Sequence, residues 1–323
     1  MAVSLLILSG CAKPLRQGQF ETTEIVTPTF LPKDNVFLAH DGAPLGLTVF
    51  GLETHPDPSH VIVAVHGMND YANAFHMAAP RWAESGIVTY AYDQRGFGRS
   101  PGKGIWPEEE LMREDVRTAV RLAREAHPDA VLTLVGMSMG AAVSITALAS
   151  DDPPEVDRFI ASGPGLRGWG ALNPLYRSSL WLSTHTRPKW IVKPPRRFVR
   201  IEPSDNNEML QRTWSDPLMT YENRIDQVYG VVSLMENAHK ALPHLPSEVP
   251  TLFTYGDNDY VIPDGAMRRS ARVLPDHART ALYEEGYHML LRDLQSQKVH
   301  DDYTHFIKNP EKPLPSGAPE WKW

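Results

Sequence analysis

The chain has 323 residues, of which 42% are hydrophobic and 22% charged, so it can build a sizeable core and is not wholly disordered. Its formal net charge of -7 argues against a general nucleic-acid binder. With a single cysteine, Cys11, the chain has neither an intramolecular disulfide nor a cysteine-based metal cluster. The length allows two ordinary domains or one large domain with an insertion.

The chain begins with a short apolar run that ends near Cys11. Val3 to Leu8 is almost wholly apolar, too short for the ~20 residues of a membrane span, and typical of the apolar part of a secretory signal. Leu8-Ser9-Gly10-Cys11 resembles the bacterial lipobox, whose cysteine is lipidated after cleavage. We therefore predict a lipoprotein signal over residues 1–11; the alternative is a disordered N-terminus with an incidental cysteine.

A lipid on Cys11 predicts a protein anchored to a membrane surface of the bacterial cell envelope without spanning it. Ala12, by the same resemblance, favours the periplasmic side of the outer membrane in a Gram-negative host. Residues 12–33 would then be a mostly polar, flexible tether.

Beyond the tether, short apolar runs alternate with helical stretches, which predicts an α/β fold: a mostly parallel eight-stranded sheet with helices on both faces. The first two strands flank His40-Asp41-Gly42 and form an antiparallel hairpin at the sheet edge. Helices are expected over Pro107 to His127 and directly after Met139. The eight predicted strands are Val36–Leu38, Leu47–Phe50, Val61–Val65, Ile87–Tyr92, Val131–Val135, Phe159–Ala161, Leu252–Tyr255 and Ala281–Tyr283.

The alternation stops between about Ser162 and Glu248, a segment that is rich in tryptophan. An insertion between two strands of one sheet explains this better than a separate domain. We therefore predict a core over 34–161 and 249–309, a helical cap over 162–248 that follows the sixth strand, and an irregular, proline-rich tail over 310–323.

A candidate nucleophile follows the strand Val131–Val135. Gly136-Met137-Ser138-Met139-Gly140 is G-x-S-x-G in the context of strand, sharp turn and helix. Glycines two before and two after the serine remove side chains that would collide on so tight a turn. The turn presents the Ser138 hydroxyl at the carboxyl edge of the sheet, beside the N-terminal amides of the next helix.

A serine nucleophile needs a base and an orienting carboxylate, which in this architecture follow in the order Asp/Glu and then His. His288 comes just after the last strand and is the predicted base. Asp259 follows the strand Leu252–Tyr255 and is the predicted orienting carboxylate, with Asp257 as a turn-stabilising neighbour. The oxyanion hole is expected from the backbone N–H groups of Met139 and Met68.

Together these motifs resemble the α/β-hydrolase superfamily, and within it the monoacylglycerol lipase-like serine hydrolases. The resemblance covers about Val36 to Asn309 and rests on the order and spacing of several motifs. These are His66-Gly67, Asp93–Ser100 (DQRGFGRS), Gly136–Gly140, Gly256–Asp259 and Gly286–His288. It implies Ser138, Asp259 and His288 as the triad, the Met68 and Met139 amides as oxyanion donors, and a cap where the tryptophan-rich insertion falls.

The resemblance implies hydrolysis of acyl esters, often monoacylglycerols or lysophospholipids, with no metal or organic cofactor. The chain departs from the group in two places. Asp70-Tyr71 stands where relatives often have a Glu-His pair, and the cap matches poorly apart from Asp216-Pro217-Leu218. We take His66 to be structural, and the histidines and aspartates between His300 and His305 to form an exposed polar helix face rather than a metal site.

Two interpretations stay open for apolar residues of the cap. Leu175, Tyr176 and Trp181 either line an acyl pocket or fill the small core of the cap itself. The basic residues from Arg187 to Arg200 are either a solvated loop, which is the default, or a contact for anionic lipid headgroups.

The predicted partners are a small acyl-ester or lipid substrate and a membrane surface, and the oligomeric state stays open. Alternatives within enzymes are an aminopeptidase or a thioesterase that uses the same triad. From another class, a non-catalytic binding lipoprotein on a hydrolase fold is the alternative.

Overall fold

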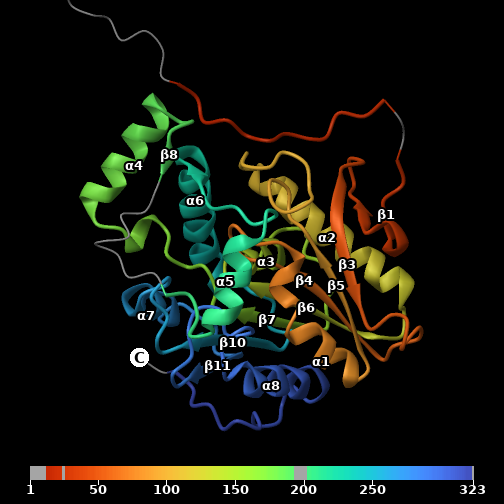
Figure 1. Cartoon of the computed structure of the whole chain (residues 1–323). Coiled ribbons are helices and arrows are strands. Elements are labelled where there is room, and N and C mark those ends of the chain that lie inside the picture. The colour runs from red at the N-terminus through yellow and green to blue at the C-terminus, as the bar shows by residue number, and fades with distance from the viewer. Residues whose placement is uncertain (1–11, 24–25, 193–201, 322–323) are drawn as a thin grey trace, which may run out of the picture.

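A computed structural model describes residues 12–23, 26–192 and 202–321 of the chain (Figure 1). Cys11 lies outside the described residues, as do four basic residues of the cap: Lys193, Arg196, Arg197 and Arg200. The described part contains a nine-stranded sheet with the strand order β1-β2-β3-β5-β4-β6-β7-β10-β11. The strands β5, β4, β6, β7, β10 and β11 run parallel, and β1, β2 and β3 form an antiparallel edge.

The predicted fold class is confirmed, and the sheet has one strand more than the eight expected. The additional strand, β1, pairs with β2 inside the segment predicted to be a tether. It is only three residues long, with no buried side chain, so the sequence offers little apolar signal for it. The strands of the sheet are β1 (Thr29–Leu31), β2 (Val36–Leu38), β3 (Pro44–Phe50), β4 (His60–Val65), β5 (Ile87–Tyr92), β6 (Val131–Met137), β7 (Arg158–Ser162), β10 (Thr251–Gly256) and β11 (Ala278–Tyr283).

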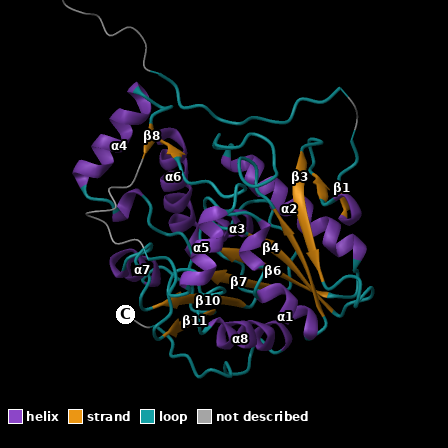
Figure 2. Ribbon diagram, viewed as in Figure 1, coloured by secondary structure: helices purple, strands orange, loops and turns teal. Residues whose placement is uncertain are grey.

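Helices cover both faces of the sheet (Figure 2). On one face α1 (Ala78–Glu84) packs against α8 (Ser296–Lys308) over one apolar cluster. On the other face α2 (Glu109–Ala126) and α3 (Met139–Leu148) pack together over the second cluster. Every residue of α3 is buried, because its small side chains let the sheet and the neighbouring helices approach closely.

The cap between β7 and β10 consists of helices and a small two-stranded antiparallel sheet. Its long helix α6 packs directly on α3 of the core, so the cap is an insertion and not an independent domain. The elements of the cap are α4 (Pro174–Thr186), α5 (Asn207–Ser215), α6 (Ile225–Ala241), and the strands β8 (Ile191–Val192) and β9 (Asn223–Arg224). The described residues also include α7 (Asp264–Ala271) and short 3-10 helices at Pro32–Asp34, Ala72–Phe75, Trp169–Ala171 and Leu242–His244.

The structure corrects the prediction of a flexible tether over 12–33. Residues 12–23, here called the strap, cross the molecule from the end of α4 toward β1 (Figure 1). The Leu15 N–H donates to the Asp226 carboxylate of the cap at 3.0 Å. Gln17 pairs with the backbone of Trp106 and Glu108 in the core. These bonds to two parts of the fold hold the strap against the body.

Of the tail predicted over 310–323, the described residues 310–321 contain neither helix nor strand, and they pack on the core. β11 is the last strand of the sheet, and the tail lies along its open edge, where the Leu282 N–H donates to the Pro319 carbonyl at 2.9 Å. Trp321 is 4% exposed and packs edge to face on Tyr255, with ring centroids 5.0 Å apart. Covering an edge strand in this way removes a site for pairing with another chain.

We expect Trp321→Ala to lower the free energy of unfolding by about 3–5 kcal/mol, because it removes a large buried side chain from the sheet edge. The control is Trp214→Ala, which removes a 60% exposed tryptophan and should change stability by less than about 0.5 kcal/mol. Urea unfolding followed by circular dichroism measures both. Equal stability of the two variants would show that the tail does not support the core.

Candidate active site

Ser138 stands on a strained turn between β6 and α3. Its backbone has φ 52° and ψ -115°, a conformation that a residue with a side chain adopts only when the surroundings impose it. The Ser138 N–H donates to the Ser162 carbonyl at 2.9 Å, and the Ser138 carbonyl accepts from the Gly165 N–H at 2.9 Å. A Cβ at Gly136 would lie 2.5 Å from the Ala141 Cα, so the turn requires that glycine.

The three predicted triad residues come together at the carboxyl edge of the sheet. Ser138 Oγ lies 2.9 Å from His288 Nε2, and His288 Nδ1 lies 2.7 Å from Asp259 Oδ2. The three residues are 7%, 6% and 8% exposed. With Nδ1 protonated and bonded to the carboxylate, Nε2 of the neutral ring is the acceptor that faces the serine hydroxyl.

Backbone groups fix the Asp259 carboxylate. Its second oxygen accepts from the N–H groups of Val261 and Ile262, both at 2.8 Å. One oxygen is therefore held by the loop, and the other is left for the imidazole. The hydrogen bond between Asp259 Oδ2 and His288 Nδ1 fixes the tautomer and the orientation of the imidazole ring.

Asp293 supports the loop that carries His288, a role that the sequence did not indicate. Its carboxylate accepts from the Tyr287 N–H at 2.8 Å and from the Ser204 hydroxyl at 2.7 Å. Burial raises the pKa of Asp293 to about 6, although these two hydrogen bonds oppose the rise. The Ser204 bond also ties this loop to the cap.

The backbone amides predicted for the oxyanion hole lie on either side of Ser138. Met139 is the first residue of α3, so its N–H has no partner within the helix. Met68 belongs to a tight turn in which the Asp70 N–H approaches the Gly67 carbonyl and Asn69 has φ 69°. A Cβ at Gly67 would lie 3.1 Å from the Ser138 Cβ, which shows how closely this turn, here called the oxyanion loop (residues 66–72), approaches the nucleophile.

Two further contacts of the oxyanion loop were not predicted. Asp70 forms a buried ion pair with Arg292, four residues after His288. The Tyr71 hydroxyl donates to the Asp216 carboxylate of the cap at 2.7 Å. The sequence carried a partial signal for both contacts, because Asp70-Tyr71 stood out as a departure from the related sequences and Asp216-Pro217-Leu218 as the part of the cap that matched them.

His66 connects the oxyanion loop to the loop after β5, in agreement with its predicted structural role. The ring is fully buried, bonds the Gly67 carbonyl through Nδ1 at 2.7 Å, and accepts from the Gln94 N–H through Nε2 at 2.8 Å. Burial lowers its pKa, which keeps the ring neutral. Asp93 completes the connection by accepting from the Ala72 N–H at 2.9 Å.

The structure gives Leu175, Tyr176 and Trp181 neither of the two expected settings. They are 77%, 62% and 52% exposed, so they neither fill a cap core nor line an enclosed acyl pocket. The reason is that α4 packs on the outer side of α6, which separates it from α3 (Figure 1).

The expectation of an exposed polar face on the final helix is also corrected. His300 and Asp302 are buried, and Asp302 accepts hydrogen bonds from Tyr283 and Ser316. Among the described residues, no group of three or more His, Cys, Asp or Glu side chains is placed to hold a metal ion.

Three features define a serine hydrolase of the α/β-hydrolase fold. They are the strand order, the strained turn that carries Ser138, and the hydrogen bonds from Ser138 through His288 to Asp259. Comparison with known families agrees, because the family described as serine aminopeptidase, S33 matches residues 56–295. The chain belongs to this family.

Known proteins with similar sequence or structure include several lipases. A monoacylglycerol lipase of Mycolicibacterium smegmatis is 26% identical over 255 residues, which are 78% of this chain and 89% of that protein. The crystal structure of the Paleococcus ferrophilus monoacylglycerol lipase superposes with a TM-score of 0.65 at 20% identity and covers 81% of this chain and 98% of that one. A soluble variant of the Saccharomyces cerevisiae monoglyceride lipase, in complex with a substrate analogue, gives a TM-score of 0.67 at 17% identity, with 83% and 92% covered.

Gly163, in the loop after β7, lies directly against His288. It has φ 49°, and an added Cβ would lie 3.0 Å from the His288 carbonyl oxygen and 3.4 Å from Nδ1. Gly163→Ala should displace the imidazole and lower kcat/KM for a soluble ester roughly tenfold or more. The control is Gly265→Ala, where a Cβ meets no atom within 4 Å and activity should not change. Wild-type kinetics in Gly163→Ala would contradict this account of the imidazole position.

Proposed function

We propose that the protein hydrolyses carboxylic esters of lipids, monoacylglycerols or lysophospholipids, through an acyl-enzyme on Ser138. The observation that carries the proposal is the chain of two hydrogen bonds, 2.9 Å and 2.7 Å long, from Ser138 through His288 to Asp259. The similarity to monoacylglycerol lipases over most of the chain supports the substrate class.

In the first half of the reaction, Ser138 Oγ attacks the ester carbonyl while His288 Nε2 takes the hydroxyl proton. Negative charge develops on the carbonyl oxygen and is stabilised by the Met68 and Met139 amides. The tetrahedral intermediate then collapses and the carbon–oxygen bond to the alcohol breaks. His288 returns its proton to the departing alcohol oxygen, which leaves the acyl group on Ser138.

Water repeats the sequence in the second half. His288 removes a proton from the water as its oxygen attacks the acyl carbonyl, and the same amides stabilise the second oxyanion. Collapse releases the carboxylic acid, and the proton on His288 returns to Ser138 Oγ. Throughout, Asp259 stays ionised and stabilises the imidazolium that forms in each half.

The residues around Ser138 favour an apolar acyl group. The Met235 side chain of α6 comes close to the nucleophile, since a Cβ at Gly165 would lie 3.0 Å from Met235 Cε and 3.2 Å from the Ser138 carbonyl carbon. Met68, in the oxyanion loop, is also partly buried. Flexible methionine side chains adapt to an alkyl chain more readily than branched ones.

The carboxylates of the surrounding loops argue against an aminopeptidase, which needs a free carboxylate to pair with the substrate ammonium group. In the described part of the chain Asp259 is engaged by His288, Asp70 by Arg292 and Asp216 by Tyr71. Glu236 of α6 accepts from Arg269 and from the Gly170 N–H. An uncharged ester suits these surroundings better.

Ser138→Ala should abolish labelling by a fluorophosphonate probe and lower kcat by at least about 10⁴-fold, because the acyl-enzyme has no other oxygen to form on. Ser179→Ala, which changes an exposed serine of α4, is the control and should keep both labelling and turnover. Absence of labelling in the wild type, or unchanged labelling of Ser138→Ala, would refute the hydrolase and favour a binding protein.

A substrate panel tests the choice of ester over amide or thioester. We expect turnover of p-nitrophenyl esters and of monoacylglycerols, because the site offers apolar surroundings and the carboxylates of Asp259, Asp70, Asp216 and Glu236 are engaged in other contacts. Aminoacyl amides and acyl thioesters are compared at the same enzyme concentration by product release. Turnover of aminoacyl amides alone would overturn the ester assignment in favour of an aminopeptidase.

We also propose that Cys11 is lipidated and anchors the protein to a membrane of the bacterial cell envelope, on the periplasmic side of the outer membrane in a Gram-negative host. The lipobox-like Leu8 to Cys11 supports this proposal. In the described part of the chain no helix is both long and apolar enough to cross a membrane.

The full chain expressed in a bacterial host with radioactive palmitate should carry label and fractionate with membranes. Cys11→Ser should lose the label, because it removes the thiol to which the lipid is attached. Its extracts should keep esterase activity, which separates anchoring from catalysis. An unlabelled wild type would refute the anchor.

A further inference from the structure

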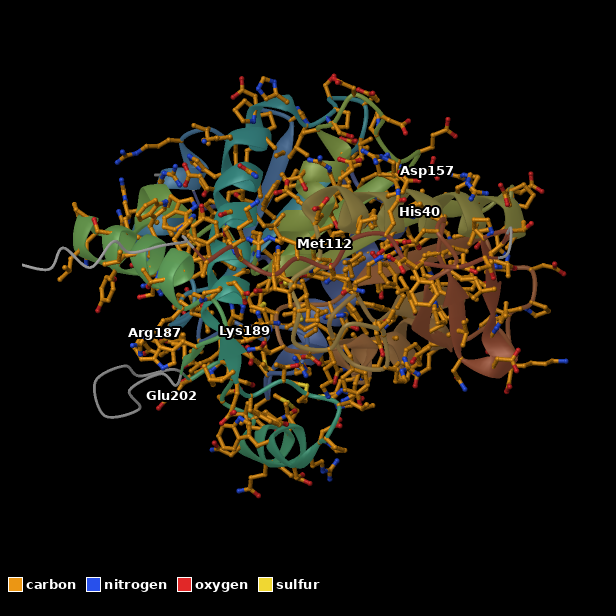
Figure 3. All side chains as sticks on the ribbon, turned by 90° about the horizontal axis from the view of Figure 1, so that it is seen from above. His40, Met112, Asp157, Arg187, Lys189 and Glu202 are labelled. Atoms are coloured by element: carbon orange, nitrogen blue, oxygen red, sulfur yellow. The ribbon has the colours of Figure 1, made fainter. Side chains whose placement is uncertain are left out.

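A short segment of the cap, residues 203–206, runs along the loop between β11 and α8 that carries His288. The described chain resumes at Glu202, which Figure 3 labels on the same side of the molecule as Arg187, and two residues later Ser204 is 3% exposed. The chain therefore turns from the surface into the fold at this segment, here called the clasp.

Each residue of the clasp forms a hydrogen bond with the chain directly after His288. The bonds join the Met289 N–H to the Pro203 carbonyl at 2.8 Å, the Ser204 hydroxyl to Asp293 at 2.7 Å, the Leu294 N–H to Asp205 at 2.8 Å, and the Asn206 side-chain amide to the Arg292 carbonyl at 3.0 Å. The Ser204 oxygen in turn accepts from the Asn206 N–H at 3.2 Å. The cap thus fixes the course of the chain that follows the base.

Asp293 extends this support to the backbone just before His288. Asp293 is 1% exposed, and its two oxygens have different partners: one accepts from the Ser204 hydroxyl at 2.7 Å, the other from the Tyr287 N–H at 2.8 Å. Since Tyr287 precedes His288, the carboxylate bridges the cap and the peptide that leads into the base. Asp259 orients the imidazole ring, whereas Asp293 holds the backbone from which that ring extends.

The surroundings of Asp293 make its charge costly. Burial raises the pKa of Asp293 to about 6, and the nearby Asp205 adds to the rise, whereas the two hydrogen bonds and His288 oppose it. A neutral side chain of similar size would cost less to bury. A buried carboxylate beside the base therefore favours a role in the site over a role in stability.

We propose that Asp293 is a positioning residue for His288 and that the clasp holds it in place through Ser204, a role that rests on the hydrolase function proposed above. Asp293 acts on the reaction through the Tyr287 N–H, which sets the position of the imidazole relative to Ser138 Oγ. Its negative charge also favours the imidazolium that forms in each half of the reaction, because Asp293 and protonated His288 attract each other.

Two substitutions of Asp293 separate its bonds from its charge. Asp293→Ala leaves the Tyr287 N–H and the Ser204 hydroxyl without this acceptor, and it should lower kcat for a p-nitrophenyl ester roughly hundredfold with KM changed less than about twofold. Asp293→Asn keeps an acceptor for the Tyr287 N–H and can donate to the Ser204 oxygen, so it should lower kcat only about fivefold. The control is Asp302→Asn, which changes a fully buried, hydrogen-bonded carboxylate of α8 and should keep the wild-type kcat.

The effect of Asp293→Asn should depend on pH. The titratable groups that face Asp293 are Asp205 of the clasp and His288, while the neighbouring Arg292 is paired with Asp70. Above its pKa of about 6 Asp293 carries a charge that asparagine lacks, and below it the carboxyl is neutral like the amide. The difference in kcat from the wild type, about fivefold at about pH 8, should therefore shrink toward equality at about pH 5. The defect of Asp293→Ala should persist at both pH values, because it comes from lost hydrogen bonds.

The contribution of the clasp is tested at Ser204. Ser204→Ala removes the bond that the cap makes to the carboxylate and should lower kcat roughly fivefold. In Asp293→Ala the same change should have no further effect, because the bond is already absent. Ser270→Ala, which removes a buried hydroxyl of α7 bonded to His239, is the control and should keep the wild-type kcat. Equal effects of Ser204→Ala in both backgrounds would contradict a connection through Asp293.

A measurement without turnover separates the role of Asp293 from the hydrolase function itself. The proton between His288 Nδ1 and Asp259 gives a far-downfield NMR signal, which the wild-type protein should show whatever its substrate. Asp293→Ala should shift or broaden this signal, and Asp302→Asn should leave it unchanged. Circular dichroism checks that each variant is folded; if Asp293→Ala does not fold, Asp293→Asn and Ser204→Ala carry the test.

The role of Asp293 is refuted if Asp293→Ala keeps both the NMR signal and the kcat of the wild type. It is also refuted if Asp293→Asn differs from the wild type by the same factor at both pH values. A wild type that a fluorophosphonate does not label would instead refute the hydrolase, while the NMR comparison still reports whether Asp293 positions His288.

Discussion

The conformation of one residue, Ser138, constrains the structure around it. A serine with φ 52° is stable only where neighbouring groups over-determine its backbone. Here the last residue of β7 bonds its N–H, and the loop after β7 bonds its carbonyl. The close approach needed for those bonds explains the glycines nearby, since a Cβ at Gly140 would collide with the Val65 carbonyl. The strain raises the hydroxyl above the sheet edge, where loops from β4, β10 and β11 reach it.

Polar contacts between loops then hold the reacting groups at hydrogen-bonding distance. His66 and Asp93 join the oxyanion loop to the loop after β5, and the buried Asp70–Arg292 pair joins it to the loop of His288. A buried ion pair adds little net stability, because desolvation of both charges offsets their attraction. Its effect here is geometric: the two loops that contribute the oxyanion donor and the base keep a fixed separation.

Much of this arrangement was predictable from the sequence because it depends on local patterns. Buried parallel strands appear in the sequence as apolar runs, and the turn at Ser138 needs glycines at fixed offsets. The core strands and the triad residues Ser138, Asp259 and His288 could therefore be placed from the sequence. Contacts between distant segments carry no such local signal. β1 is only three residues long, too short for an alternating pattern, and Asp293 acts through Ser204, 89 residues away. For α4, an apolar sequence was compatible with an inner or an outer face, and only its packing on α6 decided between them.

The cap is hydrogen-bonded both to the oxyanion loop and to the loop of His288, which couples its position to that of the catalytic groups. Thr220 donates from its backbone N–H to the Asn69 carbonyl at 3.0 Å, and Tyr71 bonds Asp216, so the cap is joined to the oxyanion loop twice. Ser204 and Asp293 join it to the loop of His288. A displacement of the cap therefore breaks hydrogen bonds at both loops at once. The strap opposes such a displacement because it bonds the first turn of α6 and the core together. The cap is thus held at three places: the oxyanion loop, the loop of His288 and the strap.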